Sequence, residues 1–499
     1  MNPSDPEAPL SRRRLLQASA AALAGLPFAH SPAQSAAQAA AAQAAAAPSA
    51  ADPVGEGPFN VLFICVDDLN DWVGPLGGHP QVQTPNLDRL ARRACVFANA
   101  HCAGPICNPS RAALLTGRHP VSTGLHFLAP TFRETDVLAD AVTLPQLFAS
   151  AGYQTMAVGK VFHGHNDPAS FPEFGGMPAS YGPTPKTKLS LPKGHPLWDW
   201  GPYWDDLTDT PDHRIADWAV RKLRRPHPAE PFFLAAGFVR PHVPMYAPQA
   251  FFDLYPQGQT HHPPVPPEPV PVSDYARRLT HAGAAPRFEY VESEGQLEHA
   301  VRSYLASVSF VDSQIGRVLD ALDASGLAGR THVVLWADHG IHLGERNRFG
   351  KRSLWERSTR VPLIIAGPGV TPGVSHEPVS LCDVYPTLAA LAGLTPPADL
   401  DGQNLDFLLH GEPTRTGTPA ALTSFGPGNH ALRSRRYRYI HYADGSEELY
   451  DHESDPHEWH NLAEDPAHAA VLHQHRQWLP QNEAPLVPNS AGSDSPLYT

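Results

Sequence analysis

FNVLFICVDD, residues 59–68, is the stretch of sequence that decides the fold. Its apolar run has the length of a strand and ends in two aspartates, Asp67 and Asp68. Such runs are typical of strands buried on both faces, as in parallel sheets that helices cover. We therefore expect a central parallel strand whose carboxyl end carries both aspartates.

Apolar segments of strand length alternate with helical segments along the main body of the chain. The helical segments carry start signals: Thr84 and Thr143 each stand before one of them, with a proline close behind, and Asp383 is expected to cap a third. Strands are expected at 153–160, 231–238, 331–340 and 361–367, and helices at 84–94, 143–152, 295–325 and 383–393. This alternation predicts an α/β fold, with a large, mainly parallel sheet sandwiched by helices.

Polar side chains follow three of the expected strands directly. Asp67 and Asp68 end the first strand, Lys160 ends the second, and Asp338 and His339 end another. In open α/β sheets, ligands bind beyond the carboxyl ends of the strands. The sequence therefore predicts that these five side chains share one site.

The pattern changes near residue 411. RYRYIHYADGSEELYD, at 436–451, alternates with the period of a strand and contains Asp444-Gly445, a hairpin turn signal. A short helix is expected at about 466–478. We interpret residues 56–410 as a catalytic domain, 411–485 as a small C-terminal α+β subdomain with an antiparallel sheet, and 486–499 as a tail.

The first fifty residues are typical of an export leader. Arg12, Arg13 and Arg14 precede a mild apolar run that is too short to remain as a membrane-spanning helix. They are similar to a twin-arginine signal, and an Ala-rich linker follows. We expect export through the twin-arginine machinery to the periplasm or the medium, without a stable membrane span. A disordered leader with chance arginines is the alternative.

Charge and cysteine content limit the classes of function. The 499-residue chain has 37 basic and 50 acidic side chains, a net charge of −13, which argues against nucleic acid as a partner. An anionic substrate would need a local cluster of cations. Five cysteines in an exported chain leave at least one unpaired, and Cys65 and Cys382 lie in apolar runs. Whether Cys95 and Cys102 pair is open.

PICNPSRAALLTGR, residues 105–118, places Cys107 and Arg111 at the start of a helix. A helix N-terminus favours negative charge, and Arg111 adds a full positive charge, so this is a site for an anion. No partner cysteine follows at the spacing of a zinc site. A thiolate nucleophile is compatible with the pattern, although an exposed thiolate is vulnerable to oxidation in an exported protein.

The same stretch resembles the sulfatase signature Cys-x-Pro-Ser-Arg followed by Leu-Thr-Gly-Arg. GYQTMAVGKVFH, at 152–163, resembles the second signature of that family, and the likeness runs from about 59 to 465. VGKVFH, RPHVP and YADGSEELYD are most similar to the iduronate-2-sulfatase branch. The resemblance implies an alkaline-phosphatase-like fold. Asn108 departs from the smaller residue common in the family, and the Cys, Pro and Arg are in place.

The resemblance implies that Cys107 is oxidised to Cα-formylglycine. Its hydrate is a geminal diol: one hydroxyl attacks sulfur and expels the alcohol, and the other then loses its proton as the aldehyde re-forms and releases sulfate. Covalent catalysis of this kind divides one difficult hydrolysis into two easier steps. Because twin-arginine export carries folded proteins, we expect a cytosolic formylglycine-generating enzyme to modify Cys107 before export.

The resemblance also implies a calcium site. Asp67, Asp68, Asp338 and His339 are similar to the calcium ligands of the family, and position 107 meets the same ion. Hard cations prefer carboxylate oxygens, which agrees with this set, and His339 is the least usual ligand in it. Taken alone, Asp67-Asp68 would more often cap a loop, and Asp338-His339 would more often form a turn.

Four further side chains correspond to roles in the family. Lys160 and Lys351 resemble lysines that hold the sulfate oxygens. His163 resembles the base that assists the diol, and His242, in RPHVP, resembles the residue that contacts sulfate and protonates the leaving oxygen. The neighbouring histidines are interpreted as surface residues or as support for the site: His101, His165 and His342.

HPLWDWGPYWDD, at 195–206, is dense in aromatic residues. It could offer sugar-stacking platforms near the site, or it could be a loop anchored by its own rings, and the sequence favours neither. Asp205 and Asp206 would repel a uronate carboxylate if they lined the pocket. The predicted function is hydrolysis of an organic sulfate ester, with a sulfated saccharide as the expected substrate. The alternatives are a phosphonate or phosphate ester hydrolase of the same superfamily and a non-catalytic binder of sulfated glycans.

Overall fold

The computed structural model describes residues 58–177, 181–225, 230–280, 283–412 and 419–498. The export leader and Ala-rich linker expected at 1–50 lie outside the described residues. Within the described ranges, no helix is both long and apolar enough to cross a membrane.

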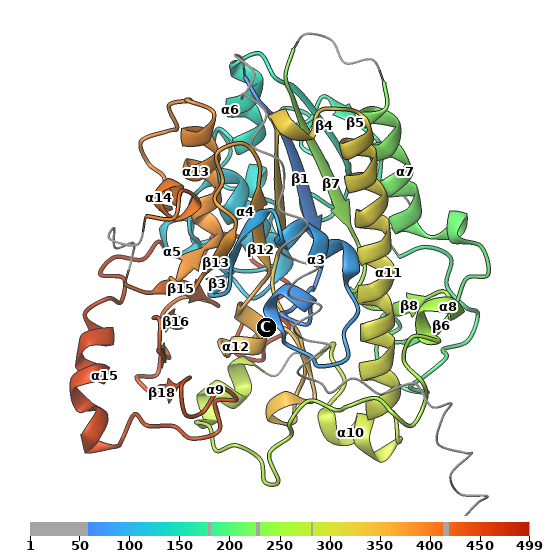
Figure 1. The fold of residues 1–499 in the computed structure, drawn as a ribbon. Helices are drawn as coiled ribbons and strands as arrows, with labels where there is room; N and C mark the ends of the chain where they lie inside the picture. The colour runs from blue at the N-terminus through green and yellow to red at the C-terminus, as the bar shows by residue number, and fades with distance from the viewer. Residues whose placement is uncertain (1–57, 178–180, 226–229, 281–282, 413–418, 499) are drawn as a thin grey trace, which may run out of the picture. The chain divides into compact units, whose positions relative to one another are not determined.

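An eight-stranded sheet forms the centre of the fold (Figure 1). Its strands, in spatial order, are β13 (Gly373–Ser375), β2 (Ala94–Phe97), β12 (Leu363–Ala366), β9 (Thr331–Ala337), β1 (Asn60–Val66), β7 (Phe232–Phe238), β4 (Gln154–Gly159) and β5 (Glu173–Phe174). β1 lies between β9 and β7, is parallel to both, and is fully buried. Only β12 among these strands is antiparallel to its neighbours. The prediction of a mainly parallel sheet with β1 at its centre is confirmed.

Helices cover both faces of this sheet, which explains why its strands are apolar on both sides. One face packs against α3 (Pro85–Ala91), α7 (Pro211–Leu223) and α11 (Leu297–Ala324), and the other against α4 (Cys107–Thr116), α6 (Leu144–Ser150) and α13 (Val384–Leu391) (Figure 1). Thr143 caps α6 through a capping box, as its sequence indicates. The shorter helices are α5 (Pro120–Thr123), α8 (Gln249–Phe252), α9 (Asp274–Leu279), α10 (Phe288–Ser293), α12 (Glu356–Thr359) and α14 (Asp406–Leu409).

The register of the central strands brings the predicted polar side chains to one edge. Val66 of β1 pairs with Ala337 of β9 and with Phe238 of β7. Gly159 of β4 pairs with Gly237 of β7. The residues that follow β1, β9 and β4 in the chain therefore emerge side by side at the carboxyl edge of the sheet.

A separate antiparallel sheet lies in the C-terminal part of the chain. It consists of β15 (Ala421–Ser424), β16 (His430–Arg433), β17 (Tyr437–His441) and β18 (Glu447–Asp451), and α15 (Ala469–Arg476) follows it. Gly445 has a φ of 86° in the turn between β17 and β18, a conformation that glycine adopts without strain. The hairpin predicted at this turn is confirmed.

Three local features differ from the sequence expectation or resolve it. Asp383 does not cap α13 with its side chain, which instead accepts hydrogen bonds from the backbone of Ser380 and Gln403. Residues of the expected tail pack on the main body, where Ala491 exchanges backbone hydrogen bonds with Ala129. All five cysteines are buried and unpaired, so Cys95 and Cys102 form no disulfide.

Candidate active site

A cavity of about 230 Å³ opens beyond the carboxyl edge of the sheet. It is lined by side chains from distant parts of the chain: Asp68, Cys107, Leu128, His163, Tyr181, His195, Leu197, Trp198, His242, Val243, Ala284, Ala285, Lys351, Arg352 and Asp494. Five of the residues that the sequence indicated are in this lining, and the others contact one another or the lining residues through hydrogen bonds and ion pairs. The structure brings the five predicted side chains at the strand ends, Asp67, Asp68, Lys160, Asp338 and His339, close together.

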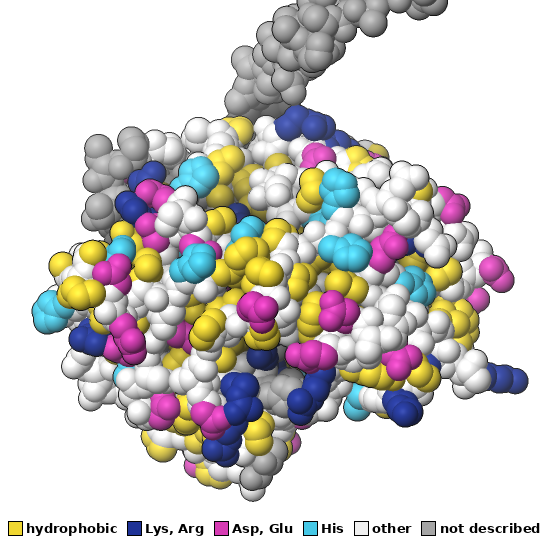
Figure 2. Space-filling view, turned by 90° about the horizontal axis from the view of Figure 1, so that it is seen from below, with side chains coloured by type: hydrophobic (Ala, Val, Ile, Leu, Met, Phe, Trp, Pro, Cys, Tyr) yellow, Lys and Arg dark blue, Asp and Glu magenta, His cyan; other side chains and the backbone are white. Residues whose placement is uncertain are grey.

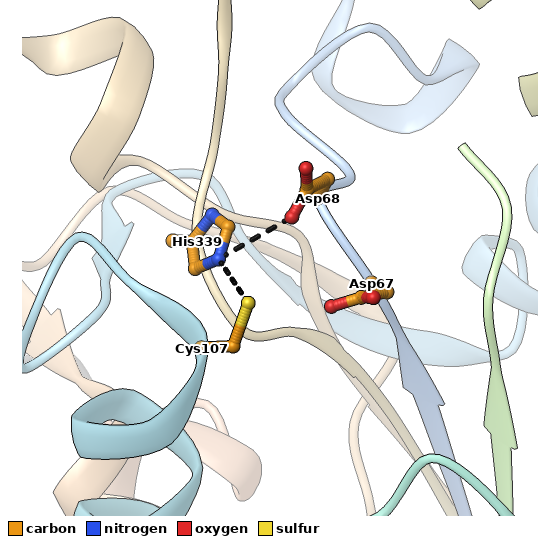
Figure 3. A group of neighbouring side chains, drawn as sticks. All are labelled: Asp67, Asp68, Cys107 and His339. Carbon is orange, nitrogen blue, oxygen red and sulfur yellow. Dashed lines mark hydrogen bonds and ion pairs between the residues drawn. The ribbon is translucent and has the colours of Figure 1, made fainter. Parts of the chain in front are cut away.

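Cys107 is the first residue of α4, at the helix start that the sequence indicates. Its Sγ atom lies 3.2 Å from Nε2 of His339 and 3.2 Å from Nζ of Lys351, which donates a hydrogen bond to it. Figure 3 shows the thiol and the imidazole of His339 pointing toward each other, with Asp67 and Asp68 beside them. Any group that replaces the sulfur at position 107 would therefore meet these side chains first.

The electrostatic environment of Cys107 strongly favours negative charge. Burial raises the pKa of its thiol, but the positive charges of Lys160, Lys351 and His339 outweigh burial and bring the pKa well below its usual value. The start of α4 adds the partial positive charge of unpaired backbone N–H groups. The position is built to stabilise an anion.

Arg111 lies behind Cys107 and holds two carboxylates in place. Its Nε donates to Oδ2 of Asp338 at 2.8 Å, and its Nη2 donates to Oδ1 of Asp67 at 3.1 Å. Its Nη1 donates to the carbonyls of Lys160 and Val161. The side chain is buried and does not line the cavity. The sequence suggested that Arg111 meets an anion directly; the structure shows instead that it positions the carboxylates of Asp67 and Asp338.

The two lysines each contact one of the paired aspartates. Nζ of Lys160 lies 2.5 Å from Oδ2 of Asp67, and Nζ of Lys351 lies 2.7 Å from Oδ1 of Asp68. Burial raises the pKa of Asp67, but the ammonium of Lys160 outweighs this effect and lowers it far below the usual range. The pKa of Lys351 is raised, because Asp68 and Cys107 more than offset its burial. Both lysines stay charged at neutral pH.

Asp68 has the features of a metal ligand. It adopts a left-handed backbone with a φ of 58°, and its backbone N–H donates to Oδ1 of Asp338. Its Oδ2 atom is buried and has no hydrogen-bond partner among the described residues, which is costly for a carboxylate. Oxygens of Asp67 and Asp68, a nitrogen of His339 and Sγ of Cys107 all lie within 4.8 Å of one another. The donor set fits a hard cation.

Asp338 and His339 border this group. Both oxygens of Asp338 accept hydrogen bonds, from Arg111 and from the backbone of Asp68 and His339. His339 donates from Nδ1 to the carbonyl of Gly340, which turns Nε2 toward Asp68 and Cys107. Burial lowers the pKa of His339, but the carboxylate of Asp338 outweighs it and raises the pKa to about 9. A cation among these carboxylates would remove that effect and leave Nε2 free as a ligand.

Two further histidines face the cavity. Nδ1 of His242 donates to the carbonyl of Val243, which leaves Nε2 to face Cys107 and to lie 3.9 Å from Oδ2 of Asp68. The ring of Tyr181 stacks on that imidazole with ring centroids 5.5 Å apart. Burial lowers the pKa of His163 to about 4, so this side chain is neutral at physiological pH and can accept a proton.

The aromatic stretch at 195–206 includes residues that line the cavity and residues that anchor the loop, the two roles that the sequence left open. Trp198 lines the cavity, together with His195. Trp200 and Trp204 are buried anchors, and their indole N–H groups donate to Gln296 and to the carbonyl of Pro183. The adjacent aspartates, Asp205 and Asp206, are exposed and do not line the cavity.

Sequence reasoning missed several residues of the lining. Arg352 follows Lys351, is 7% exposed, and pairs with Asp494 from the expected tail. Its Nε has no hydrogen-bond partner in the described part of the chain. The basic pair Lys351-Arg352 was a signal that could have drawn attention to Arg352. Nothing in the local sequence of Asp494 indicates its place in the cavity.

The three histidines interpreted as support or surface residues do not line the cavity. His101 is buried and contacts Asn99 and Thr359, and His342 is buried against Ser353. His165 is half-buried and stacks on Phe162.

The arrangement combines a nucleophile position, fixed cations and proton carriers. Position 107 is flanked by two charged lysines and by imidazoles. A carboxylate set behind it can hold a divalent cation. These groups can bind a tetrahedral oxyanion ester, stabilise negative charge and transfer protons.

Two protein-family models match this chain. The sulfatase family model matches residues 59–394, which contain every site residue that the sequence indicated. A second model, described as the C-terminal part of N-sulphoglucosamine sulphohydrolase, matches residues 344–484 and so includes the small antiparallel sheet.

Individual relatives extend over most of the chain. A sulfatase of Formosa agariphila is 37% identical over 85% of this chain and 87% of its own length. The iduronate 2-sulfatase of Mus musculus is 31% identical over 84% of this chain and 93% of its own length. Among solved structures, a 2-O GAG sulfatase is 25% identical with a TM-score of 0.64, covering 85% of this chain and 91% of that one.

Proposed function

Because this chain belongs to the sulfatase family and is a sulfuric ester hydrolase, we propose that it removes O-sulfate from a saccharide, with position 107 as the nucleophile. The single observation that carries the proposal is the position of Cys107. It begins α4 within 3.2 Å of both His339 and Lys351, in a cavity at the strand ends. The reaction consumes water and releases an alcohol and inorganic sulfate.

The family resemblance supports conversion of Cys107 to Cα-formylglycine by a cytosolic formylglycine-generating enzyme. The hydrated aldehyde would supply one hydroxyl to attack sulfur and a second to release the sulfate. A serine at this position would have no second hydroxyl for that release. The buried cations around position 107 support the proposal, because they favour the ionised form of whatever nucleophile stands there.

The side chains around position 107 have separate roles in this proposal. Lys160 and Lys351 hold sulfate oxygens and offset the charge that develops as the S–O bond breaks. His242, whose Nε2 faces Cys107 in the cavity, protonates the leaving alcohol oxygen. His163, which is neutral, accepts the proton from the hydroxyl that releases sulfate. Arg111 holds the carboxylates of Asp338 and Asp67 in place through hydrogen bonds.

The carboxylate set supports a calcium site. Asp67, Asp68 and His339 would hold the ion, with Asp338 at its border and position 107 facing it. A divalent cation there would neutralise negative charge and acidify hydroxyl groups nearby. Oδ2 of Asp68 is buried and has no hydrogen-bond partner among the described residues, and a bound cation would supply one.

A sulfated saccharide is the substrate class that we propose. The name of one relative states iduronate 2-sulfate as its target, and that of the solved structure states a 2-O-sulfated GAG. Trp198 lines the cavity as a platform for a sugar ring. Arg352, which is paired with Asp494, lines the cavity as well, and the acids Asp205 and Asp206 lie elsewhere on the surface. Recognition of a uronate is compatible with this lining.

The arginine run at 12–14 supports export of the folded, modified enzyme by the twin-arginine machinery to the periplasm or the medium. Conversion of Arg12, Arg13 and Arg14 to lysine should retain the protein in the cytosol. Fractionation of cells followed by immunoblotting checks this, and export of the lysine variant at the normal rate would contradict it.

A screen of sulfate release from defined sulfated mono- and disaccharides tests the proposed function. We expect turnover of at least one saccharide and a much lower rate on an aryl phosphonate of matched leaving group. Faster turnover of the phosphonate would favour a phosphonate hydrolase. Tight binding of sulfated sugars without any release by the fully modified enzyme would favour a glycan binder.

A further inference from the structure

A second cavity of about 360 Å³ lies next to the active-site cavity, and its lining is rich in arginine. Its described lining residues are Pro269, Val270, Val272, Arg277, Arg278, Ala285, Pro286, Arg287, Phe288, Glu289, Arg346, Asn347, Arg348, Phe349 and Pro496. Five of them are arginines and one, Glu289, is acidic. This is a concentration of positive charge in a chain whose net charge is −13.

Arg346 is buried in this lining without a full set of partners. It is 6% exposed, and its Nε and Nη1 atoms have no hydrogen-bond partner in the described part of the chain. The guanidinium stacks on the rings of Trp355 and Tyr450, at 4.3 and 5.2 Å from their centroids, and its Nη2 donates to the hydroxyl of Tyr450. These contacts fix its plane, and two of its N–H groups are buried without a hydrogen-bond partner in the described part of the chain.

Arg348 brings a second, half-buried guanidinium to the same place. It also stacks on Trp355, at 5.1 Å from the ring centroid, and donates to the carbonyl of Thr280. Burial, and then the neighbouring charge of Arg346, lower the pKa of Arg348 to about 10. The two like charges repel each other, and the carboxylates of Glu289 and Glu448 offset burial and this repulsion only in part, so an added anion would stabilise the pair.

The remaining arginines are exposed at the mouth. Arg278 on α9 and Arg287 before α10 make no ion pair with any acid that the structure describes, whereas Arg277 pairs with Asp274. Figure 1 places α9 and α10 at its lower end, the face that Figure 2 views, where several Lys and Arg side chains lie close together. Arg278 and Arg287 are exposed, so both can meet a ligand from solution.

The two cavities adjoin. Ala285 lines both of them. β11 (Phe349–Gly350) contributes Phe349 to the arginine cavity, and Lys351, which follows it, lines the active-site cavity. A chain-like ligand bound at position 107 can therefore continue past Ala285 toward the arginines.

We propose that this arginine cavity binds a second anionic group, a sulfate or a carboxylate, on the sugar next to the one that loses its sulfate. This inference rests on the proposed saccharide sulfatase function and sharpens it: the preferred substrate is an oligosaccharide with anionic groups on adjacent sugars. Guanidinium groups suit this ligand, because they donate paired hydrogen bonds to sulfate and carboxylate oxygens.

The test compares two substrates on the mature enzyme. One is a monosulfated monosaccharide, and the other is a disaccharide with the same sulfated sugar and a second sulfate on its neighbour. The cavity variant is R278Q/R287Q, whose two side chains are exposed and whose loss spares the fold. The charge-matched control is R92Q/R221Q, at exposed positions directly after α3 and on α7, both outside the cavity lining. R348K and R348Q test the half-buried charge.

We expect R278Q/R287Q to raise KM for the disaccharide about tenfold, as loss of charge-assisted hydrogen bonds implies, with kcat unchanged. KM for the monosaccharide should change less than about twofold. R348Q should act like the double variant, R348K should retain most of the affinity, and the control should match the wild type. Added salt should raise KM for the disaccharide more steeply than for the monosaccharide.

Equal KM changes for both substrates, or none for either, would overturn the inference. Inorganic sulfate that binds by calorimetry and is lost in R278Q/R287Q, with KM for the disaccharide unaltered, would show a free-anion site instead and also overturn it. If the wild type releases sulfate from neither sugar, the proposed function fails. The affinity of C107A for the disaccharide, with and without R278Q/R287Q, then still decides whether the cavity binds it.

Discussion

Nε of Arg111 donates to Oδ2 of Asp338 across 2.8 Å, and both side chains are withdrawn from solvent. The same guanidinium reaches Asp67 through Nη2, so one side chain from α4 ties together residues that follow β1 and β9. Planar forked donors of this kind hold two carboxylates in a fixed relation, which a single ammonium group does not. The geometry of the candidate cation site therefore depends on Arg111.

Replacement of Arg111 by lysine should destabilise the protein and the site together. We expect a loss of about 3–5 kcal/mol in the free energy of unfolding, because a buried carboxylate loses its partner. Urea unfolding measures this, and Arg436→Lys, at an arginine whose partly exposed side chain pairs with Asp451, is the matched control. A loss no larger than that of the control would contradict the positioning role.

Removal of the proposed calcium ion should lower both activity and thermal stability. Without an ion, the carboxylates are balanced only by nearby side-chain cations, and Oδ2 of Asp68 has no partner in the described part of the chain. We expect chelation to lower Tm by a few degrees and calcium to restore it, since binding to the native state stabilises it.

Asp68→Asn should abolish this response to calcium and reduce kcat at least about a hundredfold, since charge stabilisation worth several kcal/mol is lost. Asp205→Asn, on an exposed residue outside the cavity, is the control. Full activity and an unchanged Tm in the presence of chelator would count against a metal centre.

Trp198→Ala should weaken saccharide binding. The ring lines the active-site cavity, and stacking on a sugar removes apolar surface from water. We expect KM for a sulfated saccharide to rise about tenfold, while Trp198→Phe, which keeps a ring, stays within about threefold. An equal effect of both variants on a small alkyl sulfate would show that the ring serves only the fold.

Acid should destabilise the protein through a histidine remote from the site. Burial lowers the pKa of His332 to about 4, and its Nδ1 has no hydrogen-bond partner within the described ranges. The unfolded state, with an ordinary histidine pKa, binds the proton more strongly, so this stability is present above pH 6.5 and is lost as pH falls toward 4.

His332→Gln should therefore lessen the loss of unfolding free energy between pH 7 and pH 5 by about 1–2 kcal/mol. The comparison uses denaturant unfolding of wild type and variant at both pH values. Parallel loss in the two proteins would contradict the assignment.

The central strand and its two aspartates could be predicted because local signals determine them. An apolar run of strand length must be buried on both faces, and its parallel neighbours end at the same edge. Asp67, Lys160 and Asp338 therefore had to meet, and the register of β1 with β9 and β7 brings them together. The family signatures added the roles of Cys107 and of the histidines.

Other features depend on contacts that no local pattern encodes. All ten residues of α4 are buried, so its sequence has no polar face to indicate that Arg111 points inward at carboxylates. Asp494 reaches the cavity from a segment that looks like a tail, and it pairs with Arg352 far away in sequence. Asp383 stands where a helix cap belongs, yet its side chain binds the backbone of Gln403.

The most direct test of the proposed formylglycine mechanism is the mass of the peptide that contains Cys107, taken from purified enzyme of measured specific activity. We expect the CH2SH group to be replaced by an aldehyde or its hydrate, in a fraction that rises in proportion to activity across preparations. We also expect Cys107→Ser to fold normally and to show no repeated turnover. A fully active enzyme whose Cys107 peptide carries an unmodified thiol would contradict the mechanism.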